Sequence, residues 1–149
     1  MQNFRLMTLA DVPAAHAIEQ QVQTHPWSQA LFIGSVQSHY CTVLEVDKQV
    51  VGFCILQKVL DEANLLLMAI DPNFQQRGLG LQLLEQSIDG LGSQCNMVFL
   101  EVRQSNTAAI KLYEKIGFAQ MDLRKNYYPT AQGKEHAVLM ALTLGNLFA

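Results

Sequence analysis

The feature that most constrains this chain is a turn with two glycines between two hydrophobic segments. Residues 63–70 are mostly apolar and are predicted to form a strand. After the turn, apolar side chains recur at helical spacing: Leu79, Leu83, Leu84, Ile88 and Leu91. Gly78 and Gly80 in the intervening QQRGLG allow backbone amides to approach a ligand, and the partly positive N-terminus of the following helix attracts anions. The sequence therefore predicts a strand–turn–helix unit that binds phosphate or pyrophosphate.

The glycine spacing limits the class of phosphate ligand. A Walker loop requires Gly-x-x-x-x-Gly-Lys-Ser/Thr, and neither a lysine nor a hydroxyl residue follows Gly80. The dinucleotide fingerprint requires three glycines early in a parallel βαβ unit, whereas this turn has two and lies mid-chain, after segments predicted to be antiparallel strands. Both nucleotide-binding interpretations are therefore disfavoured, and a Gln-x-x-Gly-x-Gly pattern remains.

Length and composition indicate a single globular domain. The 149 residues suffice for one substantial core, and half of them are hydrophobic. The apolar runs are too short to span a bilayer, and the start MQNFR lacks the basic region and long apolar stretch of a signal peptide. We therefore expect one domain over residues 1–149, monomeric, cytoplasmic and without membrane contact.

The net charge and the spacing of the cysteines and histidines argue against nucleic-acid binding, a disulfide framework and a metal site. The formal net charge of −3 disfavours direct binding of nucleic acid, although it tolerates a basic protein partner. The three cysteines show no metal-ligand spacing, and their odd number argues against a disulfide framework. Cys54 lies in an apolar run and is expected to be a buried, inert thiol. The four histidines are scattered, so we expect no metal.

The chain is predicted to alternate between helices and strands. The predicted helices cover residues 8–23, a short segment after the capping residue Ser28, the segment from 79 to about Gly90, and 106–116, which Gly117 ends. The predicted strands cover 42–46, 50–59, 63–70, 97–103, 118–127 and 136–142. The first two strands form a hairpin, and the last two flank a polar loop. The order α-α-β-β-β-α-β-α-β-β indicates a mixed sheet with helices packed on it.

Glu101 is the first candidate for acid–base chemistry. All residues of the strand 97–103 are apolar except Glu101 itself and the terminal Arg103. We therefore expect a partly desolvated carboxylate, which is a stronger proton acceptor and suits a general base. The alternative is a glutamate near a strand end whose side chain reaches solvent.

Asn106 and Tyr113 are candidates for a site shared with Glu101. They lie seven residues apart, close to two helical turns, and their helix is predicted to begin just after the strand of Glu101. An amide and a phenol would then project from one side of that helix. The alternative makes Asn106 or Ser105 a helix cap and Tyr113 an ordinary half-buried aromatic residue.

Residues around the glycine turn are candidates for binding the phosphate ligand. Arg77 adds a positive charge and hydrogen-bond donors, although an exposed arginine in a turn is often only solvated. The preceding strand end, residues 68–70, offers backbone groups to an extended ligand, while its side chains are expected in the core.

Two sets of motifs resemble known acetyltransferases. The QxxGxG turn at 75–80, together with EVRxSNxxAxxLYxxxGF at 101–118, resembles the GCN5-related N-acetyltransferase (GNAT) superfamily, which binds acetyl-coenzyme A. The segments PWS at 26–28 and NYYP at 126–129 resemble the RimI-type ribosomal-protein-alanine acetyltransferases. The resemblance covers nearly the whole chain.

The resemblance implies a fold and roles for the candidate residues. The fold would be the α+β acyl-CoA N-acyltransferase fold, a mixed and mostly antiparallel sheet with splayed central strands and about four helices. By position, Glu101 would match the general base and Tyr113 the general acid. The residues that bind acetyl-coenzyme A would be Met68, Ala69, Ile70, Gln76, Arg77, Gly78, Leu79, Gly80, Leu81 and Asn106.

The acceptor is also implied by the resemblance. It would be the N-terminal alanine of small-subunit ribosomal protein number eighteen, held partly by the loop after residues 127–129. The alternatives are a small-molecule amine, an internal lysine, or a coenzyme-binding module without catalysis. One departure is that relatives commonly have more positive charge around the turn, whereas Gln76 and Leu81 flank Arg77 here. This departure predicts a lower coenzyme affinity.

Overall fold

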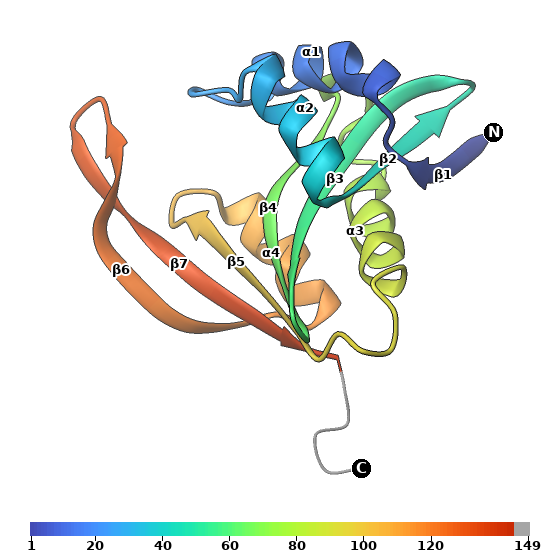
Figure 1. Cartoon of the computed structure of the whole chain (residues 1–149). Helices are drawn as coiled ribbons and strands as arrows, with labels where there is room; N and C mark the ends of the chain where they lie inside the picture. Colours follow the sequence, from blue (N-terminus) through green and yellow to red (C-terminus); the bar gives the residue numbers. More distant parts are fainter. Residues whose placement is uncertain (145–149) are drawn as a thin grey trace. The chain divides into compact units, whose positions relative to one another are not determined.

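The computed structural model describes residues 1–144 and contains four α-helices and seven strands in that part of the chain (Figure 1). The helices are α1 (Val12–Val22), α2 (Gln29–Ser38), α3 (Leu79–Asp89) and α4 (Thr107–Ile116). The strands are β1 (Gln2–Leu6), β2 (Tyr40–Val46), β3 (Gln49–Val59), β4 (Glu62–Ile70), β5 (Met97–Arg103), β6 (Ala119–Thr130) and β7 (Gly133–Thr143). Two short 3-10 turns, η1 (Leu9–Asp11) and η2 (Pro72–Phe74), precede α1 and α3.

The strands form one mixed sheet in the order β1-β2-β3-β4-β5-β7-β6. The pairs β1–β2, β2–β3, β5–β7 and β6–β7 are antiparallel, whereas β4 and β5 are parallel. The predicted α+β class, with a mostly antiparallel sheet and about four helices, is therefore confirmed.

The chain divides into two compact units. The first unit contains Met1–Lys58 and Leu66–Gly92, and the second contains Val59–Leu65 and, of the described residues, 93–144. Strand β4 therefore contributes residues to both units. The expectation that all 149 residues act as one domain stays a prediction.

In the first unit, helices cover both faces of β2. Cys41 and Val43 belong to the hydrophobic cluster that α1 and α2 complete. Thr42 lies between them and faces the other way, with its hydroxyl 2.8 Å from the Ser87 hydroxyl of α3. Because side chains alternate along a strand, burial on both faces explains why residues 41–44 are all buried.

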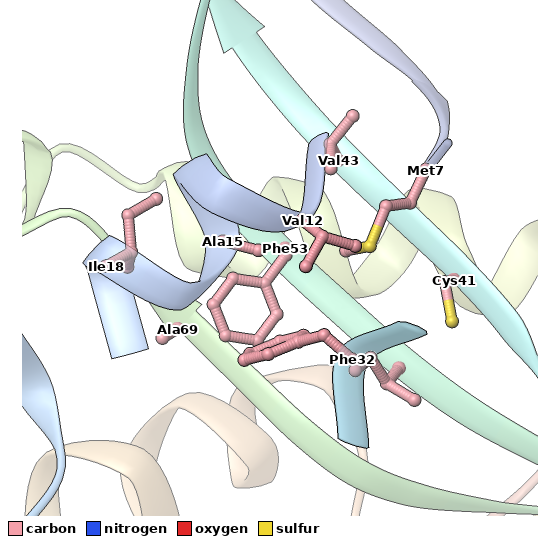
Figure 2. Packing of buried hydrophobic residues seen from close by; sticks show 10 residues of the cluster. Met7, Val12, Ala15, Ile18, Phe32, Cys41, Val43, Phe53 and Ala69 are labelled. Carbon is pink, nitrogen blue, oxygen red and sulfur yellow. The ribbon is translucent and has the colours of Figure 1, made fainter. Parts of the chain in front are cut away.

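Two phenylalanines pack against each other within the hydrophobic cluster of the first unit (Figure 2). Phe32 of α2 is fully buried and meets Phe53 of β3 edge-on, with ring centroids 5.2 Å apart. Trp27 packs on the same Phe32 at 5.7 Å. Aromatic pairs of this kind contribute about 0.5–1.5 kcal/mol beyond the area they bury. The cluster around them comprises Met7, Val12, Ala15, Ile18, Cys41, Val43, Ile55 and Ala69.

No strand was predicted before residue 42, and this was wrong because Gln2–Leu6 form strand β1. It pairs with β2 at the edge of the sheet, from Gln2–Val46 to Leu6–Thr42. Every residue of this short strand is exposed or half-buried, so it lacks the alternating pattern that predicts a strand. Arg5 holds it in place through ion pairs with Asp11, at 2.7 Å, and with Glu45 of β2.

The C-terminal hairpin of the second unit is longer than predicted. The expected polar loop after residue 127 is mostly strand, because Tyr128 pairs with Glu135 and Pro129 with Lys134. A proline is tolerated in β6 because this strand lies at the sheet edge. The register shifts between Arg124 and Tyr128, where Asn126 has a φ of 54°. The sequence showed a proline and polar residues and therefore suggested a loop.

Several predicted local signals are confirmed. Asp47 and Lys48 both have positive φ, as the two central residues of a tight hairpin require. The Ser28 side chain accepts the Leu31 N–H at the start of α2. Gly117 ends α4 with a φ of 121°. Within residues 1–144 no helix has both the length and the apolar composition needed to cross a membrane.

Candidate functional site

In the first unit, the turn after β4 is fixed to the sheet by hydrogen bonds. The Asp71 N–H donates to the Val51 carbonyl of β3 at 2.7 Å, and the Asp71 carboxylate accepts the Asn73 N–H at 2.9 Å. The Gln75 side-chain amide donates to the Ile70 carbonyl at 2.9 Å. The turn is therefore held at both its beginning and its middle.

Helix α3 begins at this turn with a glycine in place of a capping side chain. Gly78 is the N-cap, with a φ of 77°, and is exposed. The first intrahelical bond runs from the Gln82 N–H to the Gly78 carbonyl at 3.2 Å. The amides of residues 78–81 have no acceptor within the helix, as at any helix start, and no side chain caps α3. Such amides fit an anion, so the predicted phosphate turn has a suitable geometry.

Arg77 lies against its own turn. Its Nη2 donates to the Asn73 carbonyl at 3.2 Å, and its guanidinium carbon lies 5.1 Å from the centroid of the Phe74 ring. Of the preceding strand end, Ala69 and Ile70 are buried and Met68 is half-buried, as expected for core side chains. Gln76 has a φ of 64° and is exposed. These contacts place one positive charge at the start of α3.

In the second unit, Glu101 is exposed and paired with Arg124, which corrects the expectation of a desolvated carboxylate. On β5 the buried side chains are Val98, Leu100 and Val102. Glu101 points to the opposite face, and its Oε1 lies 3.3 Å from Nη1 of Arg124 on β6. The apolar residues on either side of Glu101 suggested burial, but the second face of this strand is open at Glu101.

Two tyrosines and two arginines surround this carboxylate. Arg124 lies over the Tyr127 ring at 5.2 Å, and Arg103 lies over the Tyr128 ring at 4.4 Å. Arg103 also donates to the Pro129 carbonyl at 3.1 Å. Burial, and next the charge of Glu101, raise the pKa of Tyr128 above its ordinary value. Sequence reasoning missed Arg124, because only the strand pairing brings it near Glu101.

Asn106 and Tyr113 have structural contacts of their own. Asn106 is the N-cap of α4, and its Oδ1 accepts the Ala109 N–H at 3.2 Å. The helix therefore begins one residue later than predicted, at Thr107. Tyr113 is half-buried and meets Phe118 in a T-shaped contact at 5.8 Å. The cap interpretation of Asn106 is confirmed, and the catalytic and coenzyme roles of both residues stay predictions.

Potential metal ligands and the Cys54 thiol are further reactive side chains of the described residues. Within residues 1–144 there is no group of three or more His, Cys, Asp or Glu side chains able to hold a metal ion. Cys54 is completely buried, and burial raises the pKa of its thiol to about 12. The thiolate is therefore scarce at neutral pH, as predicted for an inert core cysteine.

Comparison with known proteins extends over the whole chain. A model of the acetyltransferase (GNAT) family matches residues 6–118. The chain is 47% identical over 146 residues to the [ribosomal protein bS18]-alanine N-acetyltransferase of Salmonella typhimurium, covering 97% of this chain and 99% of that one.

Two solved structures have the same fold. The crystal structure of the ribosomal-protein-S18-alanine N-acetyltransferase from Escherichia coli superposes with a TM-score of 0.92 at 41% identity, covering 98% of this chain and 96% of that one. A putative acetyltransferase from Salmonella typhimurium, solved with its cofactor acetyl-CoA, is only 18% identical and shows the fold alone, with a TM-score of 0.85 and coverage of 99% and 96%. The protein therefore belongs to the GNAT family of acetyltransferases and is an acyltransferase.

Proposed function

We propose that this protein transfers the acetyl group of acetyl-coenzyme A to the N-terminal alanine of ribosomal protein bS18. The observation that supports this most strongly is the 47% identity, over nearly the full length of both chains, to a relative named for that reaction. The exposed, glycine-capped start of α3 supports a phosphate-containing co-substrate. Acetyl-coenzyme A supplies the acetyl group as a thioester.

The residues of the first unit are assigned to the coenzyme. The backbone amides of Gly78, Leu79, Gly80 and Leu81, with the adjacent Gln76 and Arg77, would bind the pyrophosphate. The end of β4, residues 68–70, would hold the acetyl and pantetheine arm through backbone groups. In the second unit, the amide of Asn106 would add a polar contact to the coenzyme in addition to capping α4.

Proton transfer is assigned to two residues of the second unit. Glu101 accepts the proton that the amine loses as its nitrogen attacks the acetyl carbon. Tyr113 donates a proton to the sulfur as the carbon–sulfur bond breaks. The products are an acetylated amine and the free thiol, so no covalent enzyme intermediate is required.

The acidity of the amine favours an N-terminal acceptor over lysine. A model α-amine has a pKa of about 7.7–8.0, against about 10.4 for lysine. At neutral pH about a tenth of α-amines are neutral, compared with fewer than about one lysine in a thousand. A single exposed carboxylate such as Glu101 is a sufficient base for the first substrate and a weak one for the second.

The acceptor is tested by offering several amines to the purified protein with acetyl-coenzyme A. We expect release of the thiol with a peptide that reproduces the alanine-starting N-terminus of bS18. The same peptide with its α-amine already acetylated should release none. Preference for a polyamine or an internal lysine would replace the proposed acceptor, and coenzyme binding without transfer to any amine would identify a non-catalytic module.

The assigned roles are tested in the same assay by removing each proton-transfer group. General acid–base groups typically contribute about 10²–10⁴-fold. Glu101→Gln and Tyr113→Phe should lower kcat within that range and leave the thermal stabilisation by coenzyme unchanged. Matched controls are Glu62→Gln, at an exposed position at the start of β4, and Tyr40→Phe on β2. Full activity in either catalytic variant would remove the role assigned to that residue.

A further inference from the structure

An ion pair connects the carboxylate of Glu101 to a strand that is not its neighbour. Glu101 lies on β5 and Arg124 on β6, and β7 lies between these two strands. Nevertheless Nη1 of Arg124 is 3.3 Å from Oε1 of Glu101. Adjacent strands are about 4.7–4.9 Å apart, so the side chains of Arg124 and Glu101 together bridge two strand spacings.

The strand register shows how the arginine crosses β7. Ala137 of β7 pairs with Arg103 on one side and with Arg124 on the other, so these three side chains lie on one face. Glu101 lies two residues before Arg103 and therefore on the same face. Because Ala137 ends at its β-carbon, the long side chain of Arg124 can pass over it toward Glu101. The ion pair is thus diagonal across the sheet.

The other groups on this face leave Arg124 as the direct partner of the carboxylate. From β7, Leu139 stands opposite Glu101 in the register and is apolar. Arg103, the other cation of β5, lies over Tyr128, donates to Pro129 and lies 3.7 Å from Glu135. On β6, Asp122 pairs with Leu139 in the register, so a second carboxylate lies on this face, two residues before Arg124. Tyr127 lies under Arg124, and Tyr128 lies under Arg103.

We propose that Arg124 is a positioning residue for Glu101, which it holds in a fixed orientation for accepting the proton of the amine. The inference depends on the proposed function, because it needs Glu101 to be the base. The ring of Tyr127 lies against the guanidinium, at 5.2 Å. An ion pair holds two long side chains in one geometry.

The test compares kcat and KM of three variants with those of the wild type, using the alanine-starting peptide. Arg124→Gln removes the charge, and Arg124→Lys keeps it. Lys125→Gln removes the same charge from the next residue of β6, which is exposed. A change that lowers kcat and leaves KM unchanged has removed an interaction that acts in the transition state and not in substrate binding.

In Arg124→Gln the kcat should fall about two- to fivefold with an unchanged KM for the peptide, because the carboxylate is no longer held in place. Arg124→Lys should restore most of the kcat, and Lys125→Gln should match the wild type. Thermal melting of each variant at pH 7 confirms that it is folded.

The possible failures are distinguishable. If the wild type does not acetylate the peptide, the proposed function fails and takes the inference with it. If the wild type is active but Arg124→Gln has the same kcat, the inference alone is overturned. A raised KM with an unchanged kcat also overturns it, because that result indicates a role in binding the peptide. An equal fall of kcat in Lys125→Gln would show a general charge effect and would overturn the inference as well.

Discussion

At the scale of single residues, Glu19 is a completely buried carboxylate on α1. Its Oε2 accepts the Trp27 N–H at 3.0 Å, and its Oε1 has no hydrogen-bond partner among the described residues. Burial raises the pKa of Glu19 above the ordinary value, and the Trp27 N–H and then the charge of His16 oppose that shift. Glu19 thus connects α1 to the segment that precedes α2, at the cost of desolvating an acid.

The raised pKa of Glu19 predicts a pH dependence of stability. The folded state binds this proton more tightly than the unfolded state does. The contribution of Glu19 to the free energy of unfolding is therefore full below its unfolded-state pKa of about 4.3, and it is lost as the pH rises through its folded-state pKa. Glu19→Gln mimics the protonated acid and should remove this loss. We expect the melting temperature of the wild type to fall more steeply than that of the variant between pH 4 and pH 8.

The control for this prediction is Glu85→Gln, at an exposed position on α3. It should keep the pH slope of the wild type. In a chain of this size, each kcal/mol of unfolding free energy shifts the melting temperature by about 2–4 °C, so the difference is measurable by thermal melting. Parallel slopes for the wild type and Glu19→Gln would contradict the assignment.

The burial of Glu19 was not predicted from the sequence, and the prediction of a desolvated Glu101 was wrong. Glu19 follows Ile18 on a helix and gave no sign of burial, because its partner Trp27 comes close only when the chain folds back after α1. Glu101 has apolar neighbours and was expected to be desolvated, yet only one face of β5 is fully buried. Sequence periodicity describes a strand or helix by itself, whereas burial depends on which elements pack against each face.

At the scale of elements, the start of α3 is the part that the sequence predicted best. The glycine turn, the strand before it and the helix after it all occur where expected, because each has a strong local signal. Strand β5 matches the predicted residues 97–103. Strand β1 and the end of the β6–β7 hairpin, residues 128–135, were missed, since these segments form strands only through pairing with a neighbour.

The start of α3 supplies a prediction about coenzyme binding. Gly78→Leu places a side chain beside the exposed amides of α3 and in a positive-φ conformation that costs about 1–2 kcal/mol. A ligand at 100 times its Kd stabilises a protein by about 2.7 kcal/mol. We expect Gly78→Leu to lose most of the rise in melting temperature that acetyl-coenzyme A gives the wild type.

Gly92→Leu is the matched control for the loss of coenzyme binding. Gly92 also has a positive φ, of 90°, and an added β-carbon would meet nothing within 4 Å at either glycine. Both variants should therefore melt lower than the wild type without ligand. Only Gly78→Leu should lose the response to the coenzyme, and an equal loss in both variants would argue against binding at the start of α3.

At the scale of the whole molecule, the assigned roles divide between the two units. The first unit contains the glycine turn and the end of β4, and the second contains Glu101, Asn106 and Tyr113. The family was predictable from motifs in both units, and the match over residues 6–118 confirms it. The acceptor was implied by the resemblance of residues 26–28 and 126–129 to RimI-type enzymes, and it stays a prediction.

Intact-protein mass spectrometry of ribosomal proteins, from cells with and without this gene, tests the acceptor in its natural setting. We predict that bS18 is heavier by one acetyl group when the gene is present, that the added group lies on its N-terminal alanine, and that the gene for the Glu101→Gln variant does not restore it. An unchanged mass of bS18, with the acetyl group found on a lysine or on a different molecule, would contradict the proposed function.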